Sequence, residues 1–151
     1  MALGEHTDFG SVTVLFNRLG GLQVLLPGEE GEWLYVRPLE GHAIVNLGDA
    51  MVRFTGGLLR SNIHRVVAPP GEQAGETRYS LVYFARPEDD VVLKRLESSV
   101  IPLLAEGEEE EDINAMDWVN RRALKKRVGF FEEEEWEKNL GTERISARSR
   151  M

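Results

Sequence analysis

The chain has 151 residues, no cysteine and a formal net charge of −8. Its length suits one domain with a buried core, the lack of cysteine excludes disulfides and thiolate metal sites, and the negative charge argues against a nucleic-acid surface. No apolar run approaches membrane-spanning length, and residues 1–5 have no signal-peptide pattern. We therefore expect a cytoplasmic protein with no membrane or nucleic-acid partner.

Residues 6 to about 87 are typical of short strands separated by turns rich in glycine, proline, asparagine and aspartate. β-Branched and apolar runs predict strands over residues 11–16, 22–26, 33–36, 43–47, 51–55, 64–68 and 77–84. No long helical pattern interrupts them, which disfavours alternating βαβ units. The first part of the chain is predicted to be mainly β, as a sandwich or jelly roll.

The pattern of short strands and turns ends at about Pro87. Residues 92–104 fit either a strand or a short helix, and an acidic run follows over residues 106–112. Residues 112–128 predict a helix, because apolar residues recur at helical spacing and the basic residues come late, where the helix dipole favours them. Arg121 and Arg122 belong to this basic group.

The far end of the chain is expected to form a short second helix over residues 131–140 and a frayed terminus over residues 143–151. Its aromatic residues, and Trp118 before them, are expected to be packing residues. We divide the chain into a β-domain over residues 1–105, and an acidic linker with a helical tail over residues 106–151.

His6, Asp8 and His64 are the candidate metal ligands. His6 and Asp8 are two residues apart, so on an extended segment both side chains leave the same face. Two imidazoles and one carboxylate are the ligand set of non-haem iron(II) oxygenases, provided that His64 arrives on a neighbouring strand. The alternative is a surface His6 beside an Asp8 that caps a turn.

Arg78 and Ser80 form a second candidate pair, because they also share one face of a predicted strand. A guanidinium group beside a hydroxyl is a good receptor for a carboxylate, and an arginine that points into a β-structure needs a counter-charge. A small dicarboxylate would supply that charge. The alternative places Arg78 on the outer face, beside an ordinary Ser80.

The order of these motifs, H-x-D, then H, then R-x-S, resembles the iron(II)/2-oxoglutarate-dependent dioxygenases of the isopenicillin-N-synthase-like superfamily. Three further segments resemble the same family: GLQV at residues 21–24, VNLGD at 45–49 and SNIHRV at 61–66. The resemblance extends from about residue 4 to residue 87. His42 matches no ligand position of the family and is expected to be polar surface.

The resemblance implies a double-stranded β-helix, which is a distorted jelly roll. It implies that His6, Asp8 and His64 bind Fe(II), and that Arg78 and Ser80 bind the far carboxylate of 2-oxoglutarate. The expected activity is the O2-dependent oxidation of a small organic substrate, by hydroxylation or desaturation, with release of succinate and CO2.

Family members have a long N-terminal region before H-x-D, whereas this chain begins five residues before His6. We expect an incomplete β-helix with an unpaired sheet edge and exposed apolar surface, or a partner chain that supplies the missing half. Two alternatives stay open: a truncated or non-catalytic metal-binding β-domain, and an iron oxidase that ignores 2-oxoglutarate, like isopenicillin N synthase.

Overall fold

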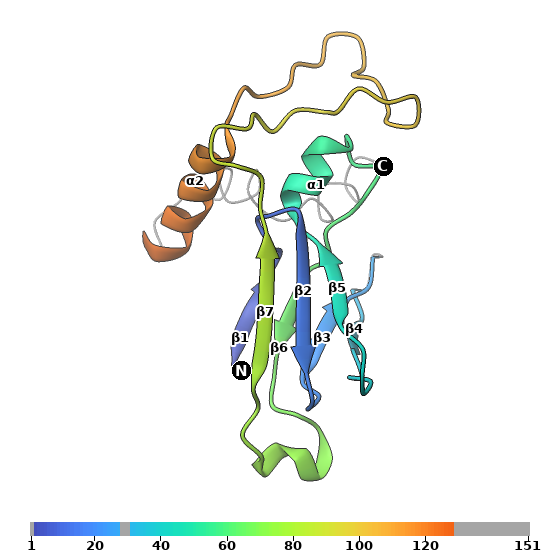
Figure 1. Ribbon diagram of the computed structural model, residues 1–151, viewed down its shortest axis with the longest axis vertical. Helices are drawn as coiled ribbons and strands as arrows, with labels where there is room; N and C mark the ends of the chain where they lie inside the picture. Colours follow the sequence, from blue (N-terminus) through green and yellow to red (C-terminus); the bar gives the residue numbers. More distant parts are fainter. Residues whose placement is uncertain (1, 28–30, 129–151) are drawn as a thin grey trace.

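The computed structural model describes residues 2–27 and 31–128 and consists mainly of two antiparallel sheets. One sheet has the order β1 (Leu3–His6), β6 (His64–Val66), β3 (Leu22–Leu25) and β4 (Trp33–Tyr35). The other has the order β5 (Ile44–Leu47), β2 (Val12–Asn17) and β7 (Ser80–Ala85). The three-stranded sheet lies in front of the four-stranded one in Figure 1. The predicted mainly β architecture is confirmed.

Strand β2 is the centre of the three-stranded sheet. It pairs along its whole length with β7, from Val12 opposite Ala85 to Asn17 opposite Ser80, and pairs with β5 on its other side. Side chains alternate between the two faces of a strand. Thr13 and Leu15 of β2 therefore line the cavity between the sheets, while Phe16 is exposed on the outer face.

The strand predicted over residues 51–55 is wrong, because this segment belongs to helix α1 (Asp49–Phe54). Asp49 stands in the first turn, where a negative charge favours a helix. The first N–H groups of α1 bond to a neighbouring loop: Asp49 donates to the Asp8 carbonyl at 2.8 Å, and Ala50 donates to the Gly10 carbonyl at 3.1 Å. Helix ends leave such donors unpaired, so this tertiary contact stabilises the helix.

Gly48 lets this loop approach α1 closely. A Cβ atom at residue 48 would collide with the carbonyl oxygens of Gly10 and Asp8. The turn between β5 and α1 therefore requires glycine, and it places the start of α1 against the segment that follows His6.

Helix α2 (Ala115–Val128) confirms most of the helix predicted over residues 112–128. Asn114 determines where it begins, because its side-chain oxygen accepts a hydrogen bond from the Asp117 N–H at 2.8 Å. Ala115 and Trp118 then pack with Leu93 and with Ala50 of α1 in a buried apolar cluster. This cluster attaches the predicted tail to the β-domain.

Residues 92–104 form neither of the two structures considered for them. They are irregular apart from one bridge between Val92 and Asn114. Earlier in the chain, a short 3₁₀ helix, η1 (Gly71–Gly75), lies before β7. The second helix expected over residues 131–140 and the end of the chain lie outside the described residues. Among the described helices, none has the length and apolar character needed to cross a bilayer.

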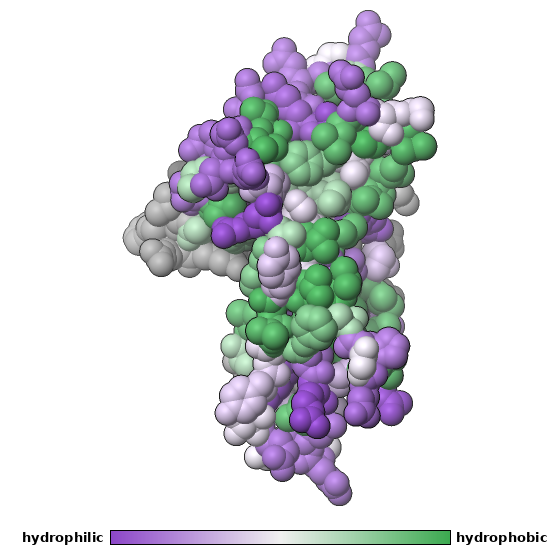
Figure 2. Space-filling model, in the orientation of Figure 1, coloured by the Kyte–Doolittle hydropathy of each residue, from purple (hydrophilic) through white to green (hydrophobic). Residues whose placement is uncertain are grey.

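The outer face of the three-stranded sheet is apolar and exposed, as Figure 2 shows over the middle of the molecule. Leu81 is 71% exposed, Tyr83 is 68% exposed and Val45 is 60% exposed. The exposed apolar surface expected from the sequence is therefore present on this sheet.

Candidate functional site: a two-histidine, one-carboxylate centre

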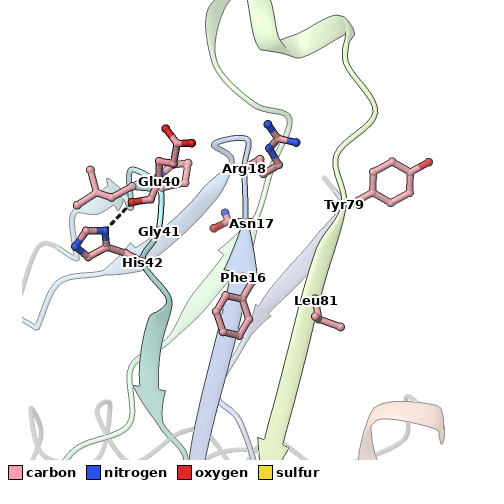
Figure 3. Close-up of a pocket in the computed structure, with 10 residues that line it drawn as sticks. Phe16, Asn17, Arg18, Glu40, Gly41, His42, Tyr79 and Leu81 are labelled. Atoms are coloured by element: carbon pink, nitrogen blue, oxygen red, sulfur yellow. Dashed lines mark hydrogen bonds between the residues drawn. The ribbon is translucent and has the colours of Figure 1, made fainter.

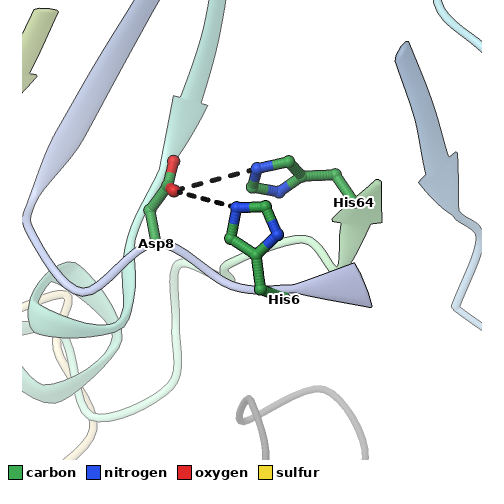
Figure 4. Close-up of side chains that lie close together, drawn as sticks. All are labelled: His6, Asp8 and His64. Atoms are coloured by element: carbon green, nitrogen blue, oxygen red, sulfur yellow. Dashed lines mark ion pairs between the residues drawn. The ribbon is translucent and has the colours of Figure 1, made fainter. Parts of the chain in front are cut away.

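His6 and His64 face each other across the antiparallel pair of β1 and β6, where they are direct register partners. Their ring centroids are 4.3 Å apart. Asp8 follows β1 and turns its carboxylate toward both rings, as Figure 4 shows. The structure thus brings together the three residues selected from the sequence.

The ligand atoms of the three residues lie within 4.8 Å of one another. Asp8 Oδ1 is 3.8 Å from His6 Nε2 and 3.7 Å from His64 Nε2. These separations are too long for strong hydrogen bonds and leave room for an ion between the three atoms. His6, His64 and Asp8 are all largely buried, with exposed fractions of 13%, 13% and 7%.

Backbone carbonyls orient both imidazoles. His6 Nδ1 lies 2.8 Å from the Gly4 oxygen, and His64 Nδ1 lies 3.0 Å from the Asn62 oxygen. A carbonyl can only accept, so each Nδ1 carries a proton, and in the neutral ring Nε2 presents a lone pair to the centre. Metal-binding histidines have this arrangement. The donor set therefore fits a divalent metal ion.

Two side chains that the sequence did not single out orient Asp8. Its second oxygen, Oδ2, accepts hydrogen bonds from Thr13 at 2.6 Å and from Asn46 at 2.7 Å. Asp8 Oδ1 is thereby left facing the histidines. Asn46 belongs to the VNLGD segment, which drew attention only through the family resemblance.

Arg78 and Ser80 lie together and line the same cavity as the three candidate ligands. Arg78 Nη1 donates to the Ser80 hydroxyl at 2.5 Å, and Arg78 Nε donates to the Gly20 carbonyl at 2.8 Å. Its remaining nitrogen, Nη2, is buried and has no hydrogen-bond partner among the described residues. Burial lowers the pKa of Arg78. An unpaired buried nitrogen on a guanidinium is costly and favours an anionic ligand.

The cavity between the sheets has a volume of about 630 Å³ and includes His6, Asp8, His64, Arg78 and Ser80 in its lining. This volume is in the range of small-molecule sites. Apolar side chains from both sheets cover much of the remaining wall, among them Leu15, Leu22, Val24, Ile44, Val82 and Phe84. Its polar groups are concentrated at the metal-ligand cluster and at Arg78.

His42, the third histidine of the chain, lies apart from this cavity. It lines a separate outer hollow with Phe16, Tyr79 and Leu81, as Figure 3 shows. Its Nδ1 is 2.9 Å from the Glu40 carbonyl, and the residue is exposed. The expectation that His42 is polar surface is confirmed.

A second buried polar cluster, also missed from the sequence, lies beside the centre. Asp49 and Arg122 form a salt bridge of 2.6 Å, with exposed fractions of 1% and 8%. Burial lowers the pKa of Arg122, and the charge of Asp49 opposes that shift. Asp49 belongs to the VNLGD segment, which could have drawn attention to it, whereas Arg122 was seen only as one of several late basic residues.

Comparison with known proteins gives concordant results. A family model described as the 2OG-Fe(II) oxygenase superfamily matches residues 1–87. The 2-oxoglutarate-dependent dioxygenase iboH of Amanita muscaria is 42% identical over 99 residues, which are 64% of this chain and 48% of that protein. The 2-oxoglutarate-dependent dioxygenase gloE of Glarea lozoyensis is 44% identical over 97 residues, which are 64% of this chain and 28% of that protein.

A solved structure is also similar. The crystal structure of full-length Neurospora crassa T7H in complex with alpha-KG and thymine matches with a TM-score of 0.70 and 32% identity, covering 82% of this chain and 37% of that one. The chain thus spans less than half the length of these relatives.

Proposed function

We propose that this chain, which belongs to the 2OG-Fe(II) oxygenase superfamily, is the catalytic part of an iron(II)- and 2-oxoglutarate-dependent oxygenase. The proposed enzyme acts on a small organic molecule. The observation that supports this proposal most strongly is the convergence of two imidazole nitrogens and one carboxylate oxygen in a cavity that is also lined by Arg78, whose guanidinium has one buried nitrogen without a hydrogen-bond partner among the described residues.

In this proposal His6, Asp8 and His64 bind iron(II). The Gly4 and Asn62 carbonyls hold the two imidazoles in the tautomer that ligation needs, while Asp8 supplies a negative charge. Three protein ligands leave other positions on the metal for 2-oxoglutarate and O2. The largely buried position of the three residues limits the access of bulk water.

Arg78 and Ser80 bind the far carboxylate of 2-oxoglutarate. Arg78 Nη2 would donate to that carboxylate, while its Nε bond to Gly20 and its Nη1 bond to Ser80 fix the plane of the guanidinium. The carboxylate would also satisfy the buried nitrogen. The keto-acid end of the co-substrate would then be held by the metal that His6, Asp8 and His64 bind.

Bound iron(II) supplies the oxidising chemistry, in which 2-oxoglutarate and O2 give succinate and CO2 while the substrate is hydroxylated or desaturated. The apolar walls of the cavity favour an organic substrate of modest size, and the thymine bound by T7H shows a molecule of that size in a similar structure. The division of the chain at residue 105, a cytoplasmic location and a partner chain that completes the β-structure stay predictions from the sequence.

The test is an anaerobic titration of the purified chain with iron(II) and then 2-oxoglutarate, following the visible metal-to-ligand charge-transfer band. We expect the band in the wild type, its loss in His64→Ala, and its persistence in the matched control His42→Ala. Succinate formation in air then tests turnover.

The other possible results of this titration support one of the two alternative functions. Iron binding without the 2-oxoglutarate band supports an oxidase of the isopenicillin N synthase kind. A folded wild-type chain that binds no iron contradicts the proposal and supports a non-catalytic module.

A further inference from the structure

The Asp49 carboxylate joins three segments that are far apart in the sequence. Its Oδ2 accepts hydrogen bonds from the Thr7 hydroxyl at 2.8 Å and from Arg122 Nη2 at 2.6 Å. Its Oδ1 accepts a hydrogen bond of 2.5 Å from the Ser61 hydroxyl. Thr7 and Ser61 are themselves buried, at 3% and 0% exposed. Both oxygens of a buried carboxylate are thus satisfied, as its desolvation requires.

Two of these segments carry the metal-ligand candidates. Thr7 stands between His6 and Asp8, and the backbone N–H of Asp49 also bonds to the Asp8 carbonyl at 2.8 Å. Ser61 precedes Asn62, whose carbonyl orients the ring of His64. Asp49 therefore anchors the backbone or a near neighbour of every candidate ligand without contacting the site where the metal would lie.

The third segment is helix α2. The Nη2 atom of Arg122, a residue of this helix, donates hydrogen bonds to the Asp49 carboxylate and, at 3.0 Å, to the Thr7 hydroxyl. Its guanidinium lies 4.9 Å from the ring of Phe9, the residue after Asp8. Removal of Arg122 would leave Asp49 as a buried carboxylate without its counter-charge, which is strongly unfavourable and would displace the segments bonded to it.

We propose that Asp49 and Arg122 are a positioning pair through which helix α2 sets the geometry of the metal ligands. This inference rests on the proposed iron site and goes beyond it, because it makes the C-terminal helix part of metal binding. Outer residues that orient ligands typically change metal affinity by about 10- to 100-fold when they are removed.

The experiment compares Arg122→Met with Arg121→Met. Arg121 is the adjacent residue on α2, is paired with Glu111 at 2.6 Å and also lies over the Trp118 ring, at 5.6 Å. Both changes therefore remove an ion pair and a contact with Trp118, but only the first removes the bonds to Asp49 and Thr7. Co(II), a probe with visible absorption bands, is titrated anaerobically into each folded protein, with the Kd measured by calorimetry and the bands recorded.

We expect Arg122→Met to raise the Co(II) Kd by about 10- to 100-fold and to shift the cobalt bands. Arg121→Met should bind as the wild type does, within about twofold. Arg122→Lys, which keeps the charge, should recover part of the affinity.

If Arg122→Met does not fold, Thr7→Val takes its place, because it keeps the side-chain shape and removes only the shared hydroxyl. Its expected effect is a rise of about tenfold in the Co(II) Kd. Wild-type affinity and wild-type cobalt bands in the folded variant would overturn the inference. A wild-type protein that binds no Co(II) would instead overturn the proposed iron site, and this inference with it.

Discussion

Asn46 donates its side-chain amide to Asp8 Oδ2 at 2.7 Å, on the opposite side of the carboxylate from both histidines. Thr13 donates to the same oxygen and is the register partner of Asn46 in the β2–β5 pair. The three-stranded sheet thus orients the carboxylate ligand, while β1 and β6 of the other sheet supply the two imidazoles. The candidate centre depends on the relative position of the two sheets.

Asn46→Ala is expected to weaken metal binding by about tenfold, because Asp8 loses one of the two donors that keep Oδ1 turned toward the histidines. The Co(II) Kd from calorimetry measures this effect. Asn17→Ala is a matched control on β2, since within the described part of the chain the Asn17 amide bonds to the nearby Leu19 carbonyl, at 3.0 Å. Equal affinities in the two variants would mean that Asn46 does not orient Asp8.

Metal binding should also stabilise the folded chain. A ligand at 100 times its Kd raises the free energy of unfolding by about 2.7 kcal/mol when it binds only the folded state. We expect this gain from Co(II) in the wild type, measured by urea unfolding with and without the metal. Asp8→Ala should show no gain. Asp112→Ala, which removes an exposed carboxylate paired with Lys94, should keep the full gain. The same gain in Asp8→Ala would place the metal elsewhere.

Arg78→Met should separate co-substrate binding from stability. The change removes the hydrogen bonds to the Gly20 carbonyl and the Ser80 hydroxyl but also removes a buried nitrogen without a partner among the described residues, so the free energy of unfolding should fall by only about 1 kcal/mol. The affinity for 2-oxoglutarate should fall by about thirtyfold or more, corresponding to about 2 kcal/mol for a lost charged hydrogen-bond pair. The charge-transfer band measures the affinity.

Arg65→Met is the control for this change, because Arg65 bonds to Gln23 and lies over Trp33 instead of lining the cavity. A normal 2-oxoglutarate affinity in Arg78→Met, with iron bound, would assign Arg78 another role.

That His6 and Asp8 share one face could be predicted, because strand periodicity and the spacing of H-x-D are local properties. That His64 lies beside His6 was a condition of the metal-site hypothesis and was supported by the family resemblance, because it depends on the pairing of β1 with β6. By contrast, residues 51–55 were predicted as a strand because Val52 and Phe54 favour strands in isolation. The carbonyls of Asp8 and Gly10 complete the first turn of α1, and such tertiary contacts override local propensity.

The pairing of Asp49 with Arg122 could not be predicted from the sequence, because it also depends on tertiary packing. The two residues are 73 positions apart, and Arg122 looks like its basic neighbours on α2. Only the packing of Trp118 and Ala115 against Ala50 and Leu93 determines which basic side chain of the helix turns inward. Helical spacing puts Arg122 on the face of Ala115 and Trp118, but it does not show that this face meets Asp49.

Glu111 should contribute a pH-dependent part of the stability. The hydrogen bonds that Arg121 donates to it, at 2.6 and 2.9 Å, hold the pKa of Glu111 below its ordinary value. Because the pKa is lower in the folded state, the stabilisation is present above the unfolded pKa of about 4.3 and is lost as the pH falls through the folded value.

Glu111→Gln is therefore expected to lower the free energy of unfolding at pH 7 and to have a shrinking effect below about pH 4. The loss should be less than about 1 kcal/mol, because the side chain is 47% exposed and solvent screens the pair. Urea unfolding over a pH series measures it, with Glu109→Gln in the same acidic run as control. A loss that does not vary with pH would contradict the ion-pair explanation.

The apolar outer face of β7 should be replaceable without loss of stability. Leu81 and Tyr83 are 71% and 68% exposed, whereas Val82 between them lines the cavity. The double variant Leu81→Thr/Tyr83→Thr keeps residues that favour strands, so the free energy of unfolding should change by less than about 1 kcal/mol. Since exposed apolar patches promote association, sedimentation velocity should show less self-association at high concentration.

Val82→Thr is the matched change on the inner face, and it should destabilise the fold by about 1 kcal/mol or more because it places a hydroxyl among apolar side chains. Its tendency to associate should stay that of the wild type, since the outer face is unaltered. If the double variant instead loses as much stability as Val82→Thr, Leu81 and Tyr83 take part in packing that stabilises the folded chain. The comparison between the two faces of β7 thus tests whether the outer face promotes self-association without contributing to the stability of the fold.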